Sequence, residues 1–520
     1  MRTTTPSFIL KLPIKTTSSD EAILEKMFDA GRQMYNACLG ESDRRYYLMK
    51  QSKEYQRVLK MPKGNPTSVE QVARTAAFRN VSNRFQFNEY DISKYATLIR
   101  ASWVGCHLNS HIAQKISKRA FKAVQKKAFG IARRVRFKSK NQFGSLECKN
   151  NETGLIFRDN ILYCSSLKLA AIIDPKNEYQ NYGLNHRIKY CRLLKKDIKG
   201  KFRYSVQLIL EGTPYQDPKH PVGYEEVGLD IGPSTIAYVG DNKADLKQFC
   251  SEIIPDWKKT RRVQRGMNRS QRVTNHENYT DIGTIKKGVK LIWRKSKRYK
   301  KLQSKYNETN RKISEYRKSL HGKLANEIIA VGCKIKTEKL SYRAWQKQFG
   351  RSVTVRAPSM IVSLIQRKAE NAHGYLHEIP THTTKLSQTC HMCGAQVKKP
   401  LTERWHKCCG MEIQRDLYSA FLAKCVNINT DTLDRSKAKL LWGSLEPVLQ
   451  SALLRVYQES KLSTIGGNPV PASFGLGQSQ SGSHEKPEKV ITEIADDVNC
   501  STVENCEKVI ATAGILHQLV

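Results

Sequence analysis

The sequence predicts a multidomain α+β protein, and three observations support this prediction. The chain has 520 residues, which is enough for roughly two to four domains with well-formed cores. Helical periodicity dominates 40–132, and strand patterns flank it at 6–16 and from residue 133 onward. Beyond residue 222, strand and helix patterns alternate. We therefore expect a β-barrel-like domain interrupted by helices, followed by a domain of mixed α and β structure.

The first predicted domain is built from strands on both sides of the helical stretch. Its later strands are predicted at 133–138, 161–163, 188–194 and 203–210. Gly200, in a Lys-Gly-Lys turn, makes the last two strands a hairpin. Ser18-Ser19-Asp20-Glu21 provides an N-cap for the first helix. The barrel-like domain thus takes 1–17 and 133–222, its last part being a proline-bearing linker, and 18–132 is a helical insertion.

The chain is strongly basic. It holds 89 Lys and Arg against 47 Asp and Glu, a formal net charge of +42. Self-repulsion at this charge is relieved by a polyanion, so nucleic acid is the expected partner. The charge is concentrated at 258–318, where 21 Lys and Arg face 4 Asp and Glu and alternate with apolar residues. We interpret this segment as long helices with a basic face for a nucleic-acid backbone, the alternative being a solvent-exposed helical hairpin.

Targeting and membrane signals are not recognisable in the sequence. The amino terminus has no apolar core of a signal peptide, and no apolar stretch approaches the length needed to cross a bilayer. Ten of the 14 cysteines are scattered along the chain, as is typical of reduced thiols. We therefore expect a cytoplasmic protein.

Three acidic residues stand out in a chain this basic. Asp230 follows the apolar strand pattern at 227–229, Glu338 ends a strand pattern, and Asp416 begins a helical pattern. The same order of elements carries the acids of an RNase H-type fold, where carboxylates hold two Mg²⁺ ions for phosphodiester hydrolysis. Singly, each acid could be a turn residue, a strand-end residue or a helix cap. Jointly, they predict a metal-dependent nuclease site.

Four clustered cysteines predict a second metal site. Cys390 and Cys393 form a Cys-x-x-Cys-Gly knuckle, a common half-site for structural Zn²⁺. Cys408 and Cys409 are adjacent, which requires a tight backbone if both bind one ion. His406 would restore the regular spacing to Cys409, so the fourth ligand is either Cys408 or His406. The alternative is a group of reduced thiols without metal.

At these residues the chain resembles the TnpB family, the insertion-sequence-encoded RNA-guided nucleases related to type V CRISPR effectors. The resemblance is carried by Gly-Leu-Asp-Ile-Gly (228–232), Lys-Thr-Glu-Lys-Leu (336–340), the Cys-containing segment 386–394, Cys409-Gly410 and Gln-Arg-Asp (414–416). Arg-Gln-Met-Tyr-Asn (32–36) is also similar to the start of the family. Together these segments span roughly residues 6–425.

The resemblance implies a fold and a set of partners. The implied parts are a wedge-type β-barrel (1–17 and 133–222), a helical recognition insertion (18–132), a RuvC-like nuclease domain (223–385 and 414–430) and a zinc ribbon (386–413). Outside the resemblance, the sequence itself predicts a C-terminal helical segment at 431–463 and, from its Gly-, Ser-, Gln- and Pro-rich start, a flexible tail at 464–520. The implied partners are a noncoding guide RNA and a target DNA, which base pairing selects beside a short flanking motif.

The resemblance also implies site residues. Asp230, Glu338 and Asp416 would be the catalytic acids that bind Mg²⁺, and Arg415 would lie close to the scissile phosphate. Cys390, Cys393, Cys408 and Cys409 would bind a structural Zn²⁺, with His406 as the alternative to Cys408.

Two features depart from the family pattern. Gln414 and Tyr418 stand where family members commonly have Asp and Asn, and the second cysteine pair is compressed. The position of Asp416 therefore depends on an irregular metal site. An RNA-guided DNA-binding protein without cleavage is the first alternative, but all three acids are retained. A transposase or transposition accessory protein is the second, but no Tyr or Ser nucleophile stands in a recognisable His-containing motif.

Overall fold

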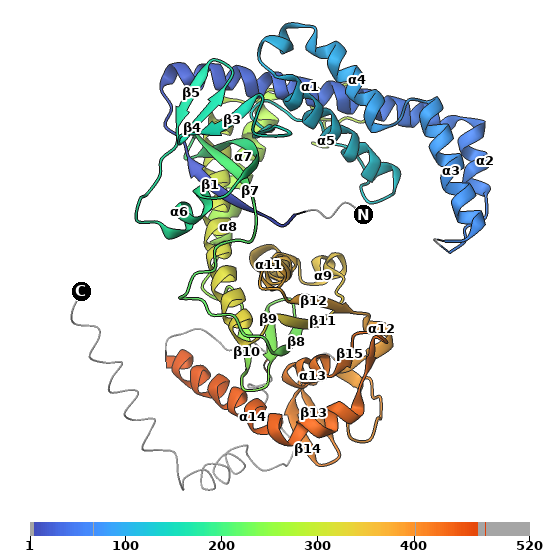
Figure 1. Cartoon of the computed structure of the whole chain (residues 1–520), viewed down its shortest axis with the longest axis vertical. Helices are drawn as coiled ribbons and strands as arrows, with labels where there is room; N and C mark the ends of the chain where they lie inside the picture. The colour runs from blue at the N-terminus through green and yellow to red at the C-terminus, as the bar shows by residue number, and fades with distance from the viewer. Residues whose placement is uncertain (1–4, 66, 401, 466–473, 475–520) are drawn as a thin grey trace. The chain divides into compact units, whose positions relative to one another are not determined.

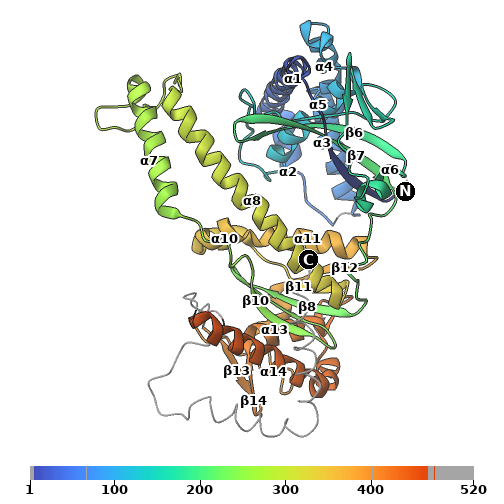
Figure 2. The same cartoon turned by 90° about the vertical axis from the view of Figure 1, so that its left-hand side faces the viewer.

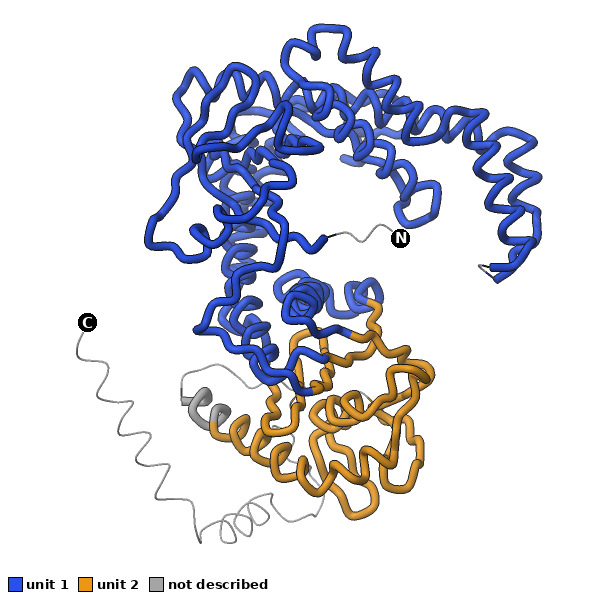
Figure 3. The backbone as a smooth tube through the Cα atoms, in the orientation of Figure 1, with its two compact units in different colours: residues 1–225, 249–334, 342–376 blue, residues 226–248, 335–341, 377–520 orange. Residues whose placement is uncertain are grey.

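The computed structural model describes residues 5–65, 67–400, 402–465 and 474. The chain divides into two compact units (Figure 1, Figure 3). Unit 1 comprises residues 1–225, 249–334 and 342–376, and unit 2 comprises residues 226–248, 335–341 and 377–520. From residue 466 onward, the predicted tail lies outside the described residues except for residue 474. No helix in the described part of the chain combines the length and apolar composition needed to cross a membrane.

Unit 1 begins with a four-stranded antiparallel sheet in the order β1-β7-β6-β2. The strands are β1 (Ser7–Pro13), β2 (Ser145–Glu147), β6 (Ile188–Ile198) and β7 (Lys201–Glu211). Phe8, Leu10 and Leu12 on β1 are buried in alternation with exposed residues, so one face of the sheet packs on the core. Lys199 and Gly200 have φ of 55° and 79°, which suits a two-residue hairpin turn, so the predicted hairpin is confirmed.

The helical insertion predicted at 18–132 is helical in the structure. It contains α1 (Ser18–Gln51), α2 (Lys53–Lys60), α3 (Val69–Arg84), α4 (Glu89–Arg100) and α5 (Ser110–Ala128). The Thr17 hydroxyl accepts a hydrogen bond from the Asp20 N–H, and the Asp20 carboxylate accepts one from the Thr17 N–H. This capping box starts α1 one residue before the predicted N-cap. Helices α1 and α5 pack against each other (Figure 1).

A second, three-stranded sheet follows in unit 1. It contains β3 (Leu155–Arg158), β4 (Ile161–Cys164) and β5 (Leu167–Ala170), all antiparallel. A bridge between Ile14 and Ala171 joins the edge of this sheet to the end of β1. Within the described residues, the strands thus form two linked sheets, and a barrel closed from them stays a prediction.

The strand predicted at 133–138 is wrong, because these residues form a loop. The Asn36 side chain donates to the Lys138 carbonyl (2.9 Å) and accepts from the Lys138 N–H (2.8 Å). A side-chain amide on α1 therefore supplies the hydrogen bonds that a neighbouring strand would provide. Phe137 is 57% exposed, so the alternating pattern of this segment does not correspond to a buried face.

The basic segment of unit 1 forms a helical hairpin (Figure 2). Its helices are α7 (Trp257–Thr274) and α8 (Lys297–Val331). Gly266 lets α8 approach, since a Cβ there would lie 3.1 Å from the Leu302 side chain. The Ser270 and Ser296 hydroxyls lie 2.7 Å apart. The remaining helices of unit 1 are α6 (Glu178–Leu184), α9 (Tyr342–Gln348), α10 (Gly350–Arg356) and α11 (Pro358–Asn371).

Unit 2 is organised around a five-stranded sheet in the order β10-β9-β8-β11-β12. The strands are β8 (Glu226–Ile231), β9 (Thr235–Val239), β10 (Ala244–Gln248), β11 (Lys334–Glu338) and β12 (Tyr375–Ile379). Helix α13 (Arg415–Lys424) packs on β8 and β9, and α14 (Arg435–Ile465) packs on β10. Leu417, Phe421 and Leu445 lie in the core between these layers. The strands predicted around Asp230 and Glu338 and the helix predicted at Asp416 are confirmed.

Candidate functional site

The three predicted acids lie on neighbouring elements of unit 2. Asp230 is near the end of the central strand β8, and Glu338 is the last residue of the adjacent strand β11. Asp416 lies in the first turn of α13, which crosses β8. All three side chains are half-buried. The elements that the sequence predicted for the three acids are therefore also neighbours in the folded structure.

Burial and mutual repulsion raise the pKa values of these carboxyls. Burial is the largest cause for Asp230, whose pKa lies well above its ordinary value, and the charges of Asp416 and Glu338 raise it further. Burial also raises the pKa of Glu338 and of Asp416. Ionised carboxylates at this site pay for lost hydration and for mutual repulsion. A divalent cation bound between them would offset both unfavourable contributions. The donor set fits Mg²⁺.

Two arginines lie beside the acids. Arg415 Nε is 3.8 Å from Asp416 Oδ1, and its positive charge offsets part of the rise in the pKa values of Asp416 and Asp230. The charge of Arg404 acts on Asp416 in the same direction. The Arg415 N–H donates to the Arg404 carbonyl (2.8 Å), which keeps the two residues together. Sequence reasoning singled out Arg415 but missed Arg404, because only the antiparallel pairing of 405–408 with 411–414 brings Arg404 to the site.

A close backbone approach places α13 against β8. A Cβ at Gly228 would lie 1.9 Å from the Ala420 carbonyl oxygen and 2.5 Å from the Lys424 nitrogen. Both are backbone atoms and cannot rotate away as a flexible side chain could. Gly228 therefore allows the helix that carries Asp416 to lie on the strand that carries Asp230.

The two residues that depart from the family pattern hold α13 in place. The Gln414 side-chain oxygen accepts a hydrogen bond from the Leu417 N–H (2.8 Å) and caps the helix. The buried Tyr418 hydroxyl accepts from the His391 N–H (3.0 Å), and the Tyr418 ring stacks on His406 at a centroid distance of 4.2 Å. These contacts connect the start of α13 to the cysteine cluster.

The four clustered cysteines meet at one point. The sulfurs of Cys390, Cys393, Cys408 and Cys409 lie within 4.8 Å of one another. Cys409 and Gly410 have φ of 53° and 79° and form a two-residue turn between β13 (Trp405–Cys408) and β14 (Met411–Gln414). This turn supplies the tight backbone that adjacent ligands need. In the part of the chain that the structure describes, the carboxylates of the three acids are not gathered to this degree.

The geometry distinguishes between the two candidates for the fourth ligand. Cys408 belongs to the sulfur group, whereas His406 lies outside it. The His406 ring is buried against Tyr418, and its Nδ1 lies 3.0 Å from Lys399 Nζ. Hydrogen bonding from the Ala395 backbone contributes most to lowering the pKa of Cys393 to about 7, which favours the thiolate that binds metal. Four sulfurs suit a tetrahedral structural Zn²⁺ with no open position.

Loss of one of the four sulfurs tests this metal site. We expect Cys409→Ser to lower the zinc content from about one ion per chain to near zero and to speed amide hydrogen exchange at 386–414. Zinc is measured by mass spectrometry of the purified protein. Cys106→Ser is the matched control, because Cys106 is an exposed thiol outside the cluster. A zinc-free protein with unchanged amide hydrogen exchange at 386–414 and normal activity would contradict a structural role for the zinc ion.

Comparison with known proteins finds one family model that matches part of this chain. Residues 359–422 match the model described as Cas12f1-like, TNB domain. The matched stretch includes the four clustered cysteines and Asp416. No curated protein matches the chain significantly.

Two cryo-EM structures are similar to the chain at low identity. The Cas12f1-sgRNA-target DNA complex gives a TM-score of 0.38 at 10% identity and covers 80% of this chain and 98% of that chain. The CRISPR-Cas12f ternary complex gives a TM-score of 0.24 at 12% identity, with the same coverage of 80% and 98%. TM-scores at this level carry no structural argument, so the assignment rests on the family match and on the motifs at 228–232 and 336–340. The match at 359–422 to a Cas12f1-like domain agrees with the TnpB-type resemblance that these motifs indicate.

Proposed function

We propose that this protein is an RNA-guided DNA endonuclease with a RuvC-like site formed by Asp230, Glu338 and Asp416. The observation that carries the proposal is the placement of three half-buried carboxylates on the neighbouring elements β8, β11 and α13. One of the two similar structures is a Cas12f1-sgRNA-target DNA complex, and we propose a noncoding guide RNA and its matching DNA as partners here.

The side chains of the site have distinct tasks in this proposal. Two Mg²⁺ ions held there would activate the attacking water and neutralise charge on the phosphate. The acids supply oxygen ligands from rigid elements, and Arg404 and Arg415 bring positive charge beside them. The Arg415 guanidinium also donates to the Pro400 carbonyl (3.1 Å), which limits its movement. We propose that this pair orients the scissile phosphate.

The other parts of the chain take roles in the same proposal. We assign residues 223–385 and 414–430 to the RuvC-like domain, and 386–413 to a zinc ribbon that supports α13. The sheets within 1–17 and 133–222 would form the wedge-type barrel, with the helices of 18–132 as the recognition insertion. The family match, which covers 359–422, supports the first two assignments.

The basic hairpin is a candidate surface for the nucleic-acid backbone. Only Gly266 is buried on α7, while its five arginines are exposed: Arg261, Arg262, Arg265, Arg269 and Arg272. A helix of this kind can present cations to several successive phosphates. We propose that α7 and the first part of α8 contact the guide RNA or the DNA paired with it.

Salt dependence tests this surface. We expect RNA affinity to fall steeply with salt, and Arg261→Gln combined with Arg265→Gln to reduce the slope of log K against log salt by about 1 to 2. Affinity is measured by filter binding between about 50 and about 400 mM KCl, so that the salt concentration varies by nearly a factor of ten. Asn268→Ala is the control, because it changes an exposed residue of the same helix without changing charge. A slope equal to that of the unmodified protein would exclude α7 from the interface.

The proposed function is tested with the RNA that copurifies with the protein. That RNA is sequenced, its guide segment is replaced, and a plasmid library with a matching target beside randomised sequence is incubated with the complex in Mg²⁺. Cleavage of matched plasmids that share a flanking motif is the expected result. Binding to these plasmids without cleavage would support the DNA-binding alternative, and strand-transfer products would support a transposase.

A further inference from the structure

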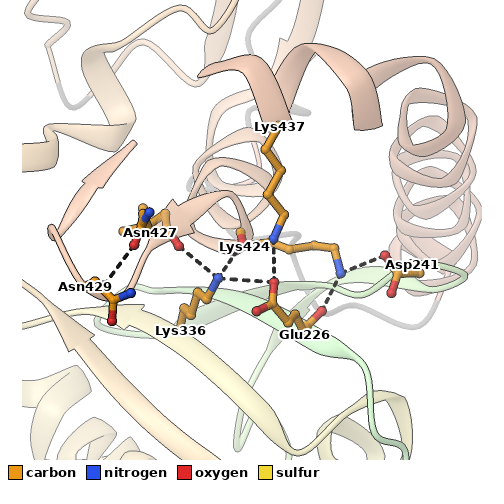
Figure 4. Close-up of polar contacts among 8 residues, drawn as sticks. Glu226, Asp241, Lys336, Lys424, Asn427, Asn429 and Lys437 are labelled. Carbon is orange, nitrogen blue, oxygen red and sulfur yellow. Dashed lines mark hydrogen bonds and ion pairs between the residues drawn. The ribbon is translucent and has the colours of Figure 1, made fainter. Parts of the chain in front are cut away.

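A group of five charged side chains, which we call the Glu226 cluster, lies within unit 2 (Figure 4). Its members are Glu226, Asp241, Lys336, Lys424 and Lys437. Lys336 and Lys424 are each only 2% exposed. Lysine is rarely buried to this extent, because desolvation of the ammonium is costly unless it is paired. The nuclease site described above does not explain why these lysines are buried.

Every donor of the Lys336 ammonium has a partner. Its Nζ donates to Glu226 Oε2 (3.2 Å), to the Lys424 carbonyl (3.0 Å) and to the Val426 carbonyl (2.9 Å). The two carbonyls lie at and just beyond the end of α13, where the helix dipole favours a positive charge. Lys336 therefore caps α13 from strand β11 and also ties that strand to β8.

Lys424 makes the complementary link. Its Nζ donates to the Glu226 backbone carbonyl (2.5 Å) and pairs with Asp241 Oδ1 (2.8 Å). Lys437 on α14 pairs with Glu226 Oε2 at 2.7 Å. Burial alone would raise the pKa of Glu226, but hydrogen bonds and charges from Lys437 and Lys336 bring it below its ordinary value. The carboxylate is therefore the ionised centre of the cluster.

The cluster connects the same three elements that carry the candidate catalytic acids. Glu226 begins β8, four residues before Asp230. Lys336 lies on β11, two residues before Glu338. Lys424 ends α13, the helix whose first turn holds Asp416. Each acid thus has a charged residue of the cluster on its own strand or helix.

We propose that Glu226, Lys336 and Lys424 are positioning residues that fix β8, β11 and α13 relative to one another, so that the three carboxylates keep a spacing suited to divalent metal. Three repelling carboxylates need such a restraint, because their mutual repulsion acts to separate the elements that carry them. Directional hydrogen bonds to backbone carbonyls fix position more closely than apolar contacts alone. This inference rests on the proposed nuclease site and adds the residues that set its geometry.

The test measures metal affinity separately from cleavage. Mn²⁺ binding to the purified full-length protein is followed by electron paramagnetic resonance, and sites still occupied in Asp230→Ala are subtracted. Lys336→Met keeps the unbranched apolar stem, one atom shorter, and removes the charge. We expect it to weaken the Asp230-dependent site by about tenfold and to raise the Mg²⁺ concentration for half-maximal cleavage by the same factor. Lys439→Met is the matched control, since Lys439 is exposed on α14 two residues from Lys437.

A double variant separates positioning from simple stability. Glu226→Gln with Lys336→Met removes both partners, so most of the cost of an unpaired buried charge disappears and the melting temperature should recover. The hydrogen bonds from Lys336 on β11 to the carbonyls at the end of α13 are still missing in this variant. Its metal affinity should therefore stay about tenfold weaker than that of the unmodified protein. Metal affinity that recovers together with the melting temperature would reduce the cluster to a stability role and overturn the proposal.

The remaining outcomes are also decisive. If Lys336→Met does not fold, Lys437→Met removes one of the two ammonium groups on Glu226 at a half-exposed position and should weaken the metal site by about two- to threefold. Whichever of these two variants folds, a metal affinity equal to that of the unmodified protein would overturn the positioning role. The proposed nuclease function would not be affected by that result. An unmodified protein without Asp230-dependent Mn²⁺ binding would overturn both.

Discussion

Asp230→Ala is expected to lower guide-directed DNA cleavage by about 10³-fold or more while leaving guide-directed DNA binding unchanged. The carboxylate lies on the central strand, and the charges of both other acids act on it, so its loss would remove one oxygen ligand from the proposed metal site. Losing metal stabilisation worth several kcal/mol corresponds to a rate loss of this size. Cleavage is measured as single-turnover rates on matched plasmid in Mg²⁺, and binding is measured in Ca²⁺.

The same substitution has a second expected effect, on stability. Because burial and the neighbouring acids raise the pKa of Asp230, the ionised carboxylate destabilises the metal-free folded protein at neutral pH. Its removal should leave the melting temperature without Mg²⁺ unchanged or higher, and should abolish the increase that Mg²⁺ produces. Glu70→Ala, at an exposed acid on α3, is the control for both measurements. A lower melting temperature together with lost DNA binding would instead identify Asp230 as a structural residue.

Gly228→Ala is expected to destabilise unit 2 by about 3 kcal/mol and to lower cleavage by about 10²-fold. The added Cβ would meet the backbone at Ala420 and Lys424, so α13 must move away from β8 and carry Asp416 with it. Thermal unfolding followed by circular dichroism and single-turnover cleavage measure the two effects. A displacement of about 1 Å at a catalytic group is sufficient for a rate loss of this size.

Another glycine provides the matched control for this variant. A Cβ at Gly443 on α14 would meet no atom within 4 Å, so Gly443→Ala should be neutral or stabilise by up to about 1 kcal/mol. The comparison separates the close approach at Gly228 from a general effect of adding a methyl group. Equal melting temperatures and rates for the two variants would show that α13 does not depend on the contact at Gly228.

Local chemistry explains which sequence predictions succeeded. The strand before Asp230, the strand that ends at Glu338 and the helix that starts beside Asp416 follow from apolar periodicity and capping within a few residues. The hairpin turn at Gly200 follows from the turn residue itself. The strand predicted at 133–138 failed because a strand needs a partner, and the hydrogen bonds come from a distant residue, Asn36.

The sequence by itself therefore determined the residue types of the candidate site and the elements on which they lie. These features depend on neighbours along the chain, where periodicity, caps and turn residues act directly. It also supplied the family motifs, and the match at 359–422 supports those that lie between 386 and 416.

Only the tertiary structure decided which distant residues meet. It brought Arg404 beside Asp416, gathered Cys408 rather than His406 with the other sulfurs, and buried Lys336, which the strand pattern alone would leave exposed. Each of these outcomes depends on the packing of α13 across β8 and on the turn at Cys409. The physical reason is that desolvation, pairing of buried charges and close backbone approach are properties of contacts between segments far apart in the chain.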